Sequence, residues 1–318
     1  QIALLGTMCL AVLVLVVYYG YYFTGLSKYE PKRRESTEPI SVILAARNER
    51  ENLKKNLPVL LSQTYSNYEV IVVNDGSFDG TADYLKELAL TEDKLKIVTL
   101  DIDERFRKGK KFAITMGIKA ASHEKLLFTD ADCMPDTKNW VSEMSACFTT
   151  NNMLLGYAPL RVRKTPLGSL IAYETLHTAL QYFGYAKKGK PYMGVGRNLA
   201  YTKTLFFDNK GFATHQHILS GDDDLFVQEV ATAENTEFCM HSDTFMYSDA
   251  PRGLAAWFKQ KRRHLSTSPA YKWGFKLRLG VYSFAQLLLY IVGGLFVLLN
   301  PSLWFLAVGV LVFKWILQ

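Results

Sequence analysis

The distribution of charge is the feature that most constrains the fold of this 318-residue chain. The sequence holds 37 Lys and Arg residues and 30 Asp and Glu residues, and all of them except Lys314 lie within residues 25–280. The two ends are therefore apolar and almost uncharged, whereas the middle has the composition of a soluble domain. This segregation excludes a simple soluble enzyme, and the length is sufficient for one or two domains with a substantial core.

Both apolar ends are predicted to cross a membrane. Residues 2–23 carry no charge, and as a helix they would reach about 33 Å, enough to span a hydrocarbon core. A secretory signal peptide is the alternative, but its basic residues would precede the apolar run rather than follow it. We predict one transmembrane helix in residues 1–24 and a hairpin in residues 281–318. The chain starts without Met and stops inside an apolar stretch, so we expect a fragment with further spans.

Basic residues gather next to both predicted membrane regions, in residues 28–34 and 252–278. By the positive-inside rule, this places the domain of residues 25–250 in the cytoplasm. We expect residues 251–280 to form an amphipathic segment at the membrane interface. The four cysteines are scattered without paired spacing, which agrees with a reducing compartment and predicts neither a disulfide framework nor a zinc site.

Short apolar runs alternate with segments of helical periodicity in the first half of the soluble part. We predict strands at 40–45, 68–73, 96–100 and 125–129, and helices at 51–63, 81–90, 112–121 and, further on, 167–185. This alternation predicts an α/β domain with a mostly parallel sheet, in which ligands bind at the carboxyl ends of the strands. The glycine-rich dinucleotide fingerprint and the Walker loop are missing, which argues against nicotinamide and flavin enzymes.

Polar motifs follow two of the predicted strands. Asp130-Ala131-Asp132 places two carboxylates one residue apart, so that both can reach one divalent cation such as Mg²⁺ or Mn²⁺. Asp75 follows the second strand, where a carboxylate can accept a hydrogen bond from a pyrimidine base. The residues after it, up to Thr81, also fit a turn and a helix cap.

Two further motifs lie closer to the C-terminal apolar end. The triplet Asp222-Asp223-Asp224 could cap a helix, and in a cleft it could supply a base that activates a hydroxyl group. The basic segment 260–264 could lie on anionic lipid as part of an amphipathic helix. Its arginines could also clamp a diphosphate.

Taken together and in this order, the four motifs resemble family 2 glycosyltransferases of the GT-A fold. The likeness is to membrane-bound inverting enzymes such as the synthases of cellulose, hyaluronan and poly-N-acetylglucosamine, and it covers about residues 40–268. It implies an α/β GT-A domain, mostly parallel, with flanking transmembrane helices. It also implies a UDP-sugar donor, a divalent metal, a lipid or glycan acceptor and a place in the bacterial inner membrane.

The resemblance also assigns roles to individual residues. Donor binding falls to Ala46, Glu49, Asp75, Lys110, Lys111, Asp130, Gln260, Arg263 and His264; the donor sugar and acceptor to Gly196, Arg197 and Asn198; the metal to Asp130 and Asp132. The general base is an aspartate of the acidic triplet. Counting back from Leu225 selects Asp222, whereas counting forward from Gly221 selects Asp223. We favour Asp222 and leave both open.

One departure from the family pattern bears on the product. His264 stands where the family motif has tryptophan, and in processive synthases this tryptophan helps to form the acceptor site. We therefore expect transfer to a lipid-linked or other membrane-proximal hydroxyl, with a processive polysaccharide synthase as the alternative. Outside this class, a nucleotidyltransferase would need a triphosphate loop, and an inactive scaffold would have lost its acidic motifs. The basic residues 105–111 are interpreted as a loop over a nucleotide diphosphate, and no nucleic-acid partner is expected.

Overall fold

The structure is a computed structural model that describes residues 1–31, 33–100, 109–218 and 220–317. The chain divides into two compact units. One consists of Gln1–Tyr29 together with Tyr271–Gln318, and the other of Glu30–Ala270. Most of the segment predicted to be interfacial, residues 251–280, thus belongs to the larger unit.

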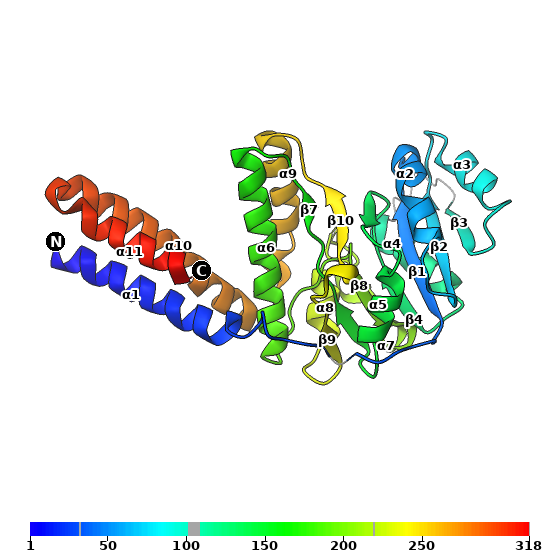
Figure 1. Cartoon of the computed structure of the whole chain (residues 1–318), viewed down its shortest axis with the longest axis horizontal. Helices are drawn as coiled ribbons and strands as arrows, with labels where there is room; N and C mark the ends of the chain where they lie inside the picture. Colours follow the sequence, from blue (N-terminus) through cyan, green and yellow to red (C-terminus); the bar gives the residue numbers. More distant parts are fainter. Residues whose placement is uncertain (32, 101–108, 219, 318) are drawn as a thin grey trace. The chain divides into compact units, whose positions relative to one another are not determined.

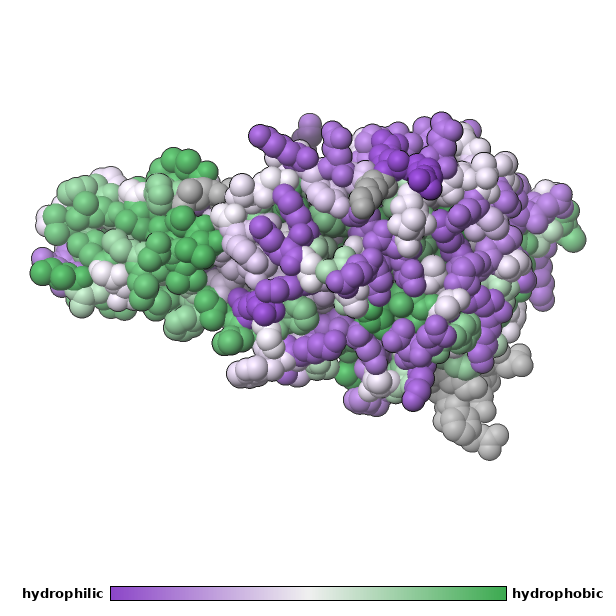
Figure 2. All heavy atoms as spheres, turned by 90° about the horizontal axis from the view of Figure 1, so that it is seen from below, coloured by the Kyte–Doolittle hydropathy of each residue, from purple (hydrophilic) through white to green (hydrophobic). Residues whose placement is uncertain are grey.

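The smaller unit is built from apolar helices: α1 (Ile2–Tyr18) with a π-helical turn (Tyr19–Phe23), α10 (Trp273–Leu299), a 3-10 turn (Pro301–Leu303) and α11 (Trp304–Leu317) (Figure 1). Two stretches, Ile2–Phe23 and Trp273–Leu299, are long and apolar enough to cross a membrane. Tyr18 stacks on Tyr282 with ring centroids 4.2 Å apart, which joins α1 to α10. The outer surface of this unit is largely apolar (Figure 2). Helix α10 begins before the predicted start of the span at residue 281.

A mostly parallel sheet forms the centre of the larger unit, as predicted. Its strands, in spatial order, are β3 (Leu95–Leu100), β2 (Tyr68–Asp75), β1 (Ile40–Ala46), β4 (Lys125–Phe128), β8 (Leu199–Thr202), β6 (Met153–Leu155) and β9 (Thr236–Phe238). Among these strands, β8 runs antiparallel to its two neighbours, and the other pairs are parallel. A small second sheet has the order β5 (Cys133–Pro135), β10 (Met246–Asp249), β7 (Leu160–Arg161).

Helices connect and cover these strands (Figure 1). They are α2 (Arg50–Leu61), α3 (Thr81–Leu88), α4 (Gly109–Ala120), α5 (Trp140–Cys147), α6 (Pro166–Lys187), α7 (Lys203–Asp208), α8 (Asp224–Val230) and α9 (Leu254–Leu265), with 3-10 turns at Ala213–His215, Ser242–Thr244 and Ser268–Ala270. The four predicted helices correspond to α2, α3, α4 and α6. Of the predicted loop 105–111, residues 109–111 belong to α4, and 105–108 lie outside the described residues.

Helix α4 packs closely on the sheet because of one glycine. A Cβ atom at Gly117 would lie 2.6 Å from Cγ2 of Ile43 in β1 and 3.0 Å from Cγ2 of Val73 in β2. Such distances leave no room for a larger side chain unless the side chains of Ile43 and Val73 move. Because α4 leads into the parallel strand β4, it runs back across the sheet. Its first turn, with Lys110, therefore lies at the carboxyl ends of the strands.

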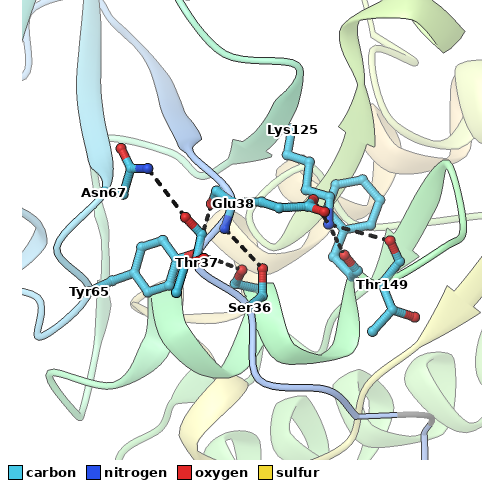
Figure 3. A network of polar contacts seen from close by, with 9 residues as sticks. Ser36, Thr37, Glu38, Tyr65, Asn67, Lys125 and Thr149 are labelled. Carbon is cyan, nitrogen blue, oxygen red and sulfur yellow. Dashed lines mark hydrogen bonds and ion pairs between the residues drawn. The ribbon is translucent and has the colours of Figure 1, made fainter.

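The chain enters β1 through a segment that is fixed by polar contacts (Figure 3). Asn67 Nδ2 donates a hydrogen bond to the carbonyl oxygen of Thr37 at 3.2 Å, and the Tyr65 hydroxyl donates one to that of Glu38 at 2.6 Å. The Glu38 carboxylate also lies 2.5 Å from Nζ of Lys125, the first residue of β4. These contacts hold the start of β1 in register with both neighbouring strands.

Candidate active site

The carboxyl ends of β1, β2 and β4 lie at one edge of the sheet because the three strands are parallel neighbours. In register, Ala46 of β1 pairs with Asn74 of β2, and Ile43 pairs with Phe128 of β4. The antiparallel strand β8 begins at the same edge, where Leu199 pairs with Phe128. The turns after β1, β2 and β4 therefore meet, as the sequence predicts, and the segment before β8 joins them.

Hydrogen bonds from main-chain N–H groups to side-chain oxygens join the turns after β1 and β2. The Asn48 N–H donates to Ser77 Oγ, and the Phe78 N–H donates to Asn48 Oδ1, both at 3.0 Å. Asn48 has a left-handed conformation with a φ of 57°, which asparagine tolerates better than most residues. Arg47 Nη1 lies 3.7 Å from the carboxylate of Asp75. The predicted residue Ala46 is buried in β1 beside these turns.

Three carboxylates lie near one another where these turns approach the end of β4. Burial raises the pKa of Glu49, and the charges of Asp132 and Asp130 raise it further. Asp132 is exposed, whereas Asp130 is only partly so. Across the described ranges, no group of three or more His, Cys, Asp or Glu side chains has the geometry to hold a metal alone. A hard cation bound here would therefore take its remaining ligands from phosphate and water, as Mg²⁺ commonly does.

Lys110 joins two of the predicted motifs. Its Nζ lies 2.8 Å from Oδ1 of Asp130 and 3.1 Å from Oδ2 of Asp222. Burial alone would lower the pKa of Lys110, but the neighbouring carboxylates, Asp130 first, raise it well above its usual value. The same contact lowers the pKa of Asp130, against the effect of burial. The charged form of Lys110 is therefore favoured, and its ammonium group lies between the side chains of Asp130 and Asp222.

These three residues line a small pocket, together with Ile114, Phe128, Thr129, Gly196, Leu199 and Tyr201. The Thr129 hydroxyl is buried in this pocket and has no hydrogen-bond partner in the part of the chain that the structure describes. An unsatisfied polar atom of this kind costs free energy, so it points to a ligand or water that binds there. Nothing in the sequence marked Thr129 or Tyr201, because neither belongs to a motif.

The three aspartates of the acidic triplet have different partners. Asp222 pairs with Lys110 and faces the pocket. Asp223 accepts hydrogen bonds from the N–H groups of Gly196 and Asp224, both at 2.8 Å, so it caps α8 as the alternative interpretation predicted. Asp224 is buried and accepts a hydrogen bond from the Thr267 hydroxyl at 2.6 Å. The structure thus gives each aspartate of the triplet a different set of partners, which the sequence could not distinguish.

The unusual proton affinity of Asp223 gives a testable pH dependence. Burial and the charges of Asp222 and Asp224 raise the pKa of Asp223 to about 7, whereas an unfolded chain would ionise it near 3.9. Between these values the folded state binds more protons, so its stability must fall as pH rises from about 4 to about 7. We expect Asp223→Asn to weaken this fall, measured as melting temperature across that range in EDTA. An identical pH profile in the variant would contradict the assignment.

Two of the predicted site residues point away from the pocket. Lys111 is buried and donates hydrogen bonds to the carbonyl oxygens of His215 and Ile218, at 2.6 and 3.0 Å. Asn198 is fully buried, and its Nδ2 donates to the carbonyl oxygens of Tyr157 and Thr244. Both side chains thus use these polar atoms for contacts within the fold, and their predicted roles toward a donor or acceptor stay predictions.

Arg197 bonds within the fold, and its charge also acts on a residue of the pocket. Its guanidinium donates to Ser248 Oγ at 2.6 Å and to the carbonyl oxygen of Ala158 at 2.8 Å. Its charge still contributes to the lowered pKa of Asp130. Gly196 meets the pocket through its main chain, where it donates to Asp223.

The predicted basic motif lies on α9. Gln260 is partly buried, whereas Arg263 and His264 are exposed. The positive charge of Arg263 contributes to the lowered pKa of Asp130, after the larger effects of Lys110 and Arg197, although Arg263 is not among the residues that line the pocket. Lys261 forms an ion pair with Glu174, which joins α9 to α6.

Comparisons with known proteins agree with this arrangement. Residues 41–164 match the family model described as Glycosyl transferase family 2. Poly-beta-1,6-N-acetyl-D-glucosamine synthase of Staphylococcus epidermidis is 38% identical over 102 residues, which cover 32% of this chain and 24% of that protein. Glycosyltransferase AglE of Haloferax volcanii is 41% identical over 103 residues, which cover 31% and 33%, respectively. The matching segment thus spans a quarter to a third of the length of these relatives.

A solved structure supports the fold over nearly the whole chain. Mannosyltransferase PcManGT from Pyrobaculum calidifontis, in complex with GDP-Man and Mn²⁺, is similar with a TM-score of 0.65 and 19% sequence identity. The likeness covers 96% of this chain and 92% of that one. At this identity it establishes the α/β GT-A fold alone, and the likeness to glycosyltransferase family 2 rests on the sequence matches. Residues 41–164 of this chain therefore resemble glycosyltransferase family 2.

Proposed function

We propose that this chain is an inverting, membrane-anchored glycosyltransferase that uses a nucleotide-diphosphate sugar, namely a UDP-sugar. The acceptor is a hydroxyl group on a lipid-linked or other membrane-proximal molecule. The observation that carries the proposal is the position of Lys110 Nζ between Asp130 and Asp222 in one pocket. This arrangement combines a cation for a diphosphate, a carboxylate for a metal and a carboxylate for a proton.

The donor would bind along the carboxyl edge of the sheet. Asp75 would accept hydrogen bonds from the base, with Glu49 beside it, and Lys110 and Arg263 would face the diphosphate. Asp130 and Asp132 would hold Mg²⁺ or Mn²⁺, which neutralises charge on the departing diphosphate when bound. The cluster of carboxylates around Asp130 and the unpaired Thr129 hydroxyl support this fit. The solved relative with GDP-Man and Mn²⁺ gives independent support.

The proposed reaction is a single displacement with inversion. The acceptor oxygen attacks the anomeric carbon from the side opposite the diphosphate, and Asp222 takes the proton of the attacking hydroxyl. The new carbon–oxygen bond forms as the bond to the β-phosphate breaks, and the nucleoside diphosphate leaves with the electron pair. Asp222 is the better base because both oxygens of Asp223 accept main-chain hydrogen bonds, and Asp224 accepts one from Thr267.

The proposal includes the membrane. Ile2–Phe23 and Trp273–Leu299 would anchor the chain, and the basic residues beside them would place the catalytic domain on the cytoplasmic side of a bacterial inner membrane. A processive polysaccharide synthase is the second candidate. It is favoured by the similarity to a poly-N-acetylglucosamine synthase and opposed by His264 at the acceptor motif.

The direct test is release of nucleoside diphosphate by the full chain in detergent. UDP-sugars and other nucleotide sugars would be supplied with Mn²⁺ or Mg²⁺, with and without polyprenyl phosphate and membrane lipid extract. We expect metal-dependent release and a product one sugar longer than the acceptor. A long polymer would instead identify a processive synthase. Absence of both release and donor binding with every nucleotide sugar would overturn the proposal.

A further inference from the structure

The segment that precedes Asp222 is hydrogen-bonded to a buried lysine of α4. Lys111 is 3% exposed, and its Nζ reaches the carbonyl oxygens of His215 at 2.6 Å and Ile218 at 3.0 Å. An ammonium group is strongly hydrated, so its burial is tolerated only because these carbonyl groups replace water. The contact therefore fixes the chain a few residues before the acidic triplet.

Lys110 and Lys111 are adjacent, and α4 directs them to different targets. Successive helical residues point about 100° apart at 3.6 residues per turn. Lys110 thus reaches Asp130 and Asp222, while Lys111 reaches the loop that carries Asp222. The first turn of α4 therefore contacts Asp222 itself through Lys110 and the chain that precedes Asp222 through Lys111.

A second hydrogen bond lies on the C-terminal side of Asp222. The hydroxyl of Thr267, which is 1% exposed, donates to Asp224 Oδ2 at 2.6 Å and also lies 3.0 Å from the carbonyl oxygen of His264. Asp224 is 6% exposed and begins α8. This hydrogen bond joins the acidic triplet to the end of α9, the helix that carries Arg263.

We propose that Lys111 and Thr267 are positioning residues that hold Asp222 at the distance from the donor that proton transfer requires. The inference rests on the proposed role of Asp222 as the base. Neither residue touches the pocket, so both act through the main chain on either side of Asp222. A small shift of a catalytic group can cost about 10²-fold in rate. Loss of either contact is therefore expected to lower turnover strongly.

The test uses the full chain in detergent and the variants Lys111→Met and Thr267→Val, each of which keeps the size of the side chain. We expect kcat to fall about 10–100-fold, while the Kd for UDP with Mn²⁺ stays within about threefold of wild type. Thr267→Ser keeps the hydroxyl group and should restore kcat. A residue that only stabilised the fold would lower the melting temperature without this division between kcat and Kd.

Matched controls exist on α4 itself and in the turn that follows α3. Lys119→Met removes an exposed lysine of α4. Thr91→Val removes a hydroxyl that donates to the carbonyl oxygen of Leu88 at 3.1 Å, the same local contact that Thr267 makes to His264, but without a carboxylate partner. We expect both control variants to keep wild-type kcat.

Comparison with Asp222→Asn separates the two proposals. If Asp222→Asn is inactive while Lys111→Met and Thr267→Val match their controls, the positioning roles are overturned and the base remains. If Asp222→Asn keeps full activity, the base assignment itself is wrong. If Lys111→Met fails to fold, the comparison of Thr267→Val with Thr267→Ser decides, and equal loss of kcat in both would overturn the inference.

Discussion

Replacement of Asp222 by Asn is expected to lower the turnover of sugar transfer by about 10²–10⁴-fold, the usual contribution of a general base. The amide keeps the shape of the side chain but cannot take the proton of the acceptor hydroxyl. Donor binding should change little, because Lys110 keeps its partner Asp130 at 2.8 Å. Release of nucleoside diphosphate under saturating donor and acceptor measures the effect.

The controls for this prediction come from the same region of the chain. Asp208→Asn changes an exposed carboxylate at the end of α7 and should leave turnover unchanged. Asp223→Asn should cost less than Asp222→Asn, because the side chain of Asp223 serves as a main-chain hydrogen-bond acceptor. Near-normal transfer by the double variant with both substitutions would exclude the acidic triplet as the source of the base.

The sheet and its functional edge could be predicted from the sequence because they depend on local patterns. Apolar runs of strand length alternate with helical periodicity, and parallel strands must bring their carboxyl ends to one edge. Asp75 and Asp130 therefore had to lie at the same edge, whatever the details of packing. The likeness to family 2 glycosyltransferases rested on the types of residue in four motifs and on the order of these motifs along the chain, both of which can be seen in the sequence.

The division of roles among neighbouring residues could not be predicted in this way. Lys110 and Lys111 have the same chemistry, and a shift of one residue on a helix decides which of them enters the pocket. Asn198 belongs to a family motif, yet its amide is consumed by main-chain carbonyl groups. Such assignments depend on long-range contacts, which adjacent positions in a sequence do not encode.

The second large effect is expected at the metal and diphosphate side of the pocket. Asp130→Asn removes the charge closest to Lys110 and one of the two carboxylates proposed to hold the cation. Since a bound divalent ion contributes several kcal/mol of charge stabilisation, we expect kcat/KM for the donor to fall at least about 10²-fold. The dependence of UDP binding on Mn²⁺, measured by calorimetry, should weaken in parallel.

This loss should differ in kind from that of Asp222→Asn, because it combines weaker donor binding with slower transfer. Asp132→Asn should weaken the Mn²⁺ dependence as well, but it should leave the contact between Lys110 and Asp130 in place. Asp136→Asn is the matched control, since that exposed carboxylate follows β5 and pairs with Arg161 outside the pocket. If UDP binding kept its full Mn²⁺ dependence in both Asp130→Asn and Asp132→Asn, the two carboxylates would not hold the cation. The charge of the leaving diphosphate would then have to be balanced by Lys110 and Arg263.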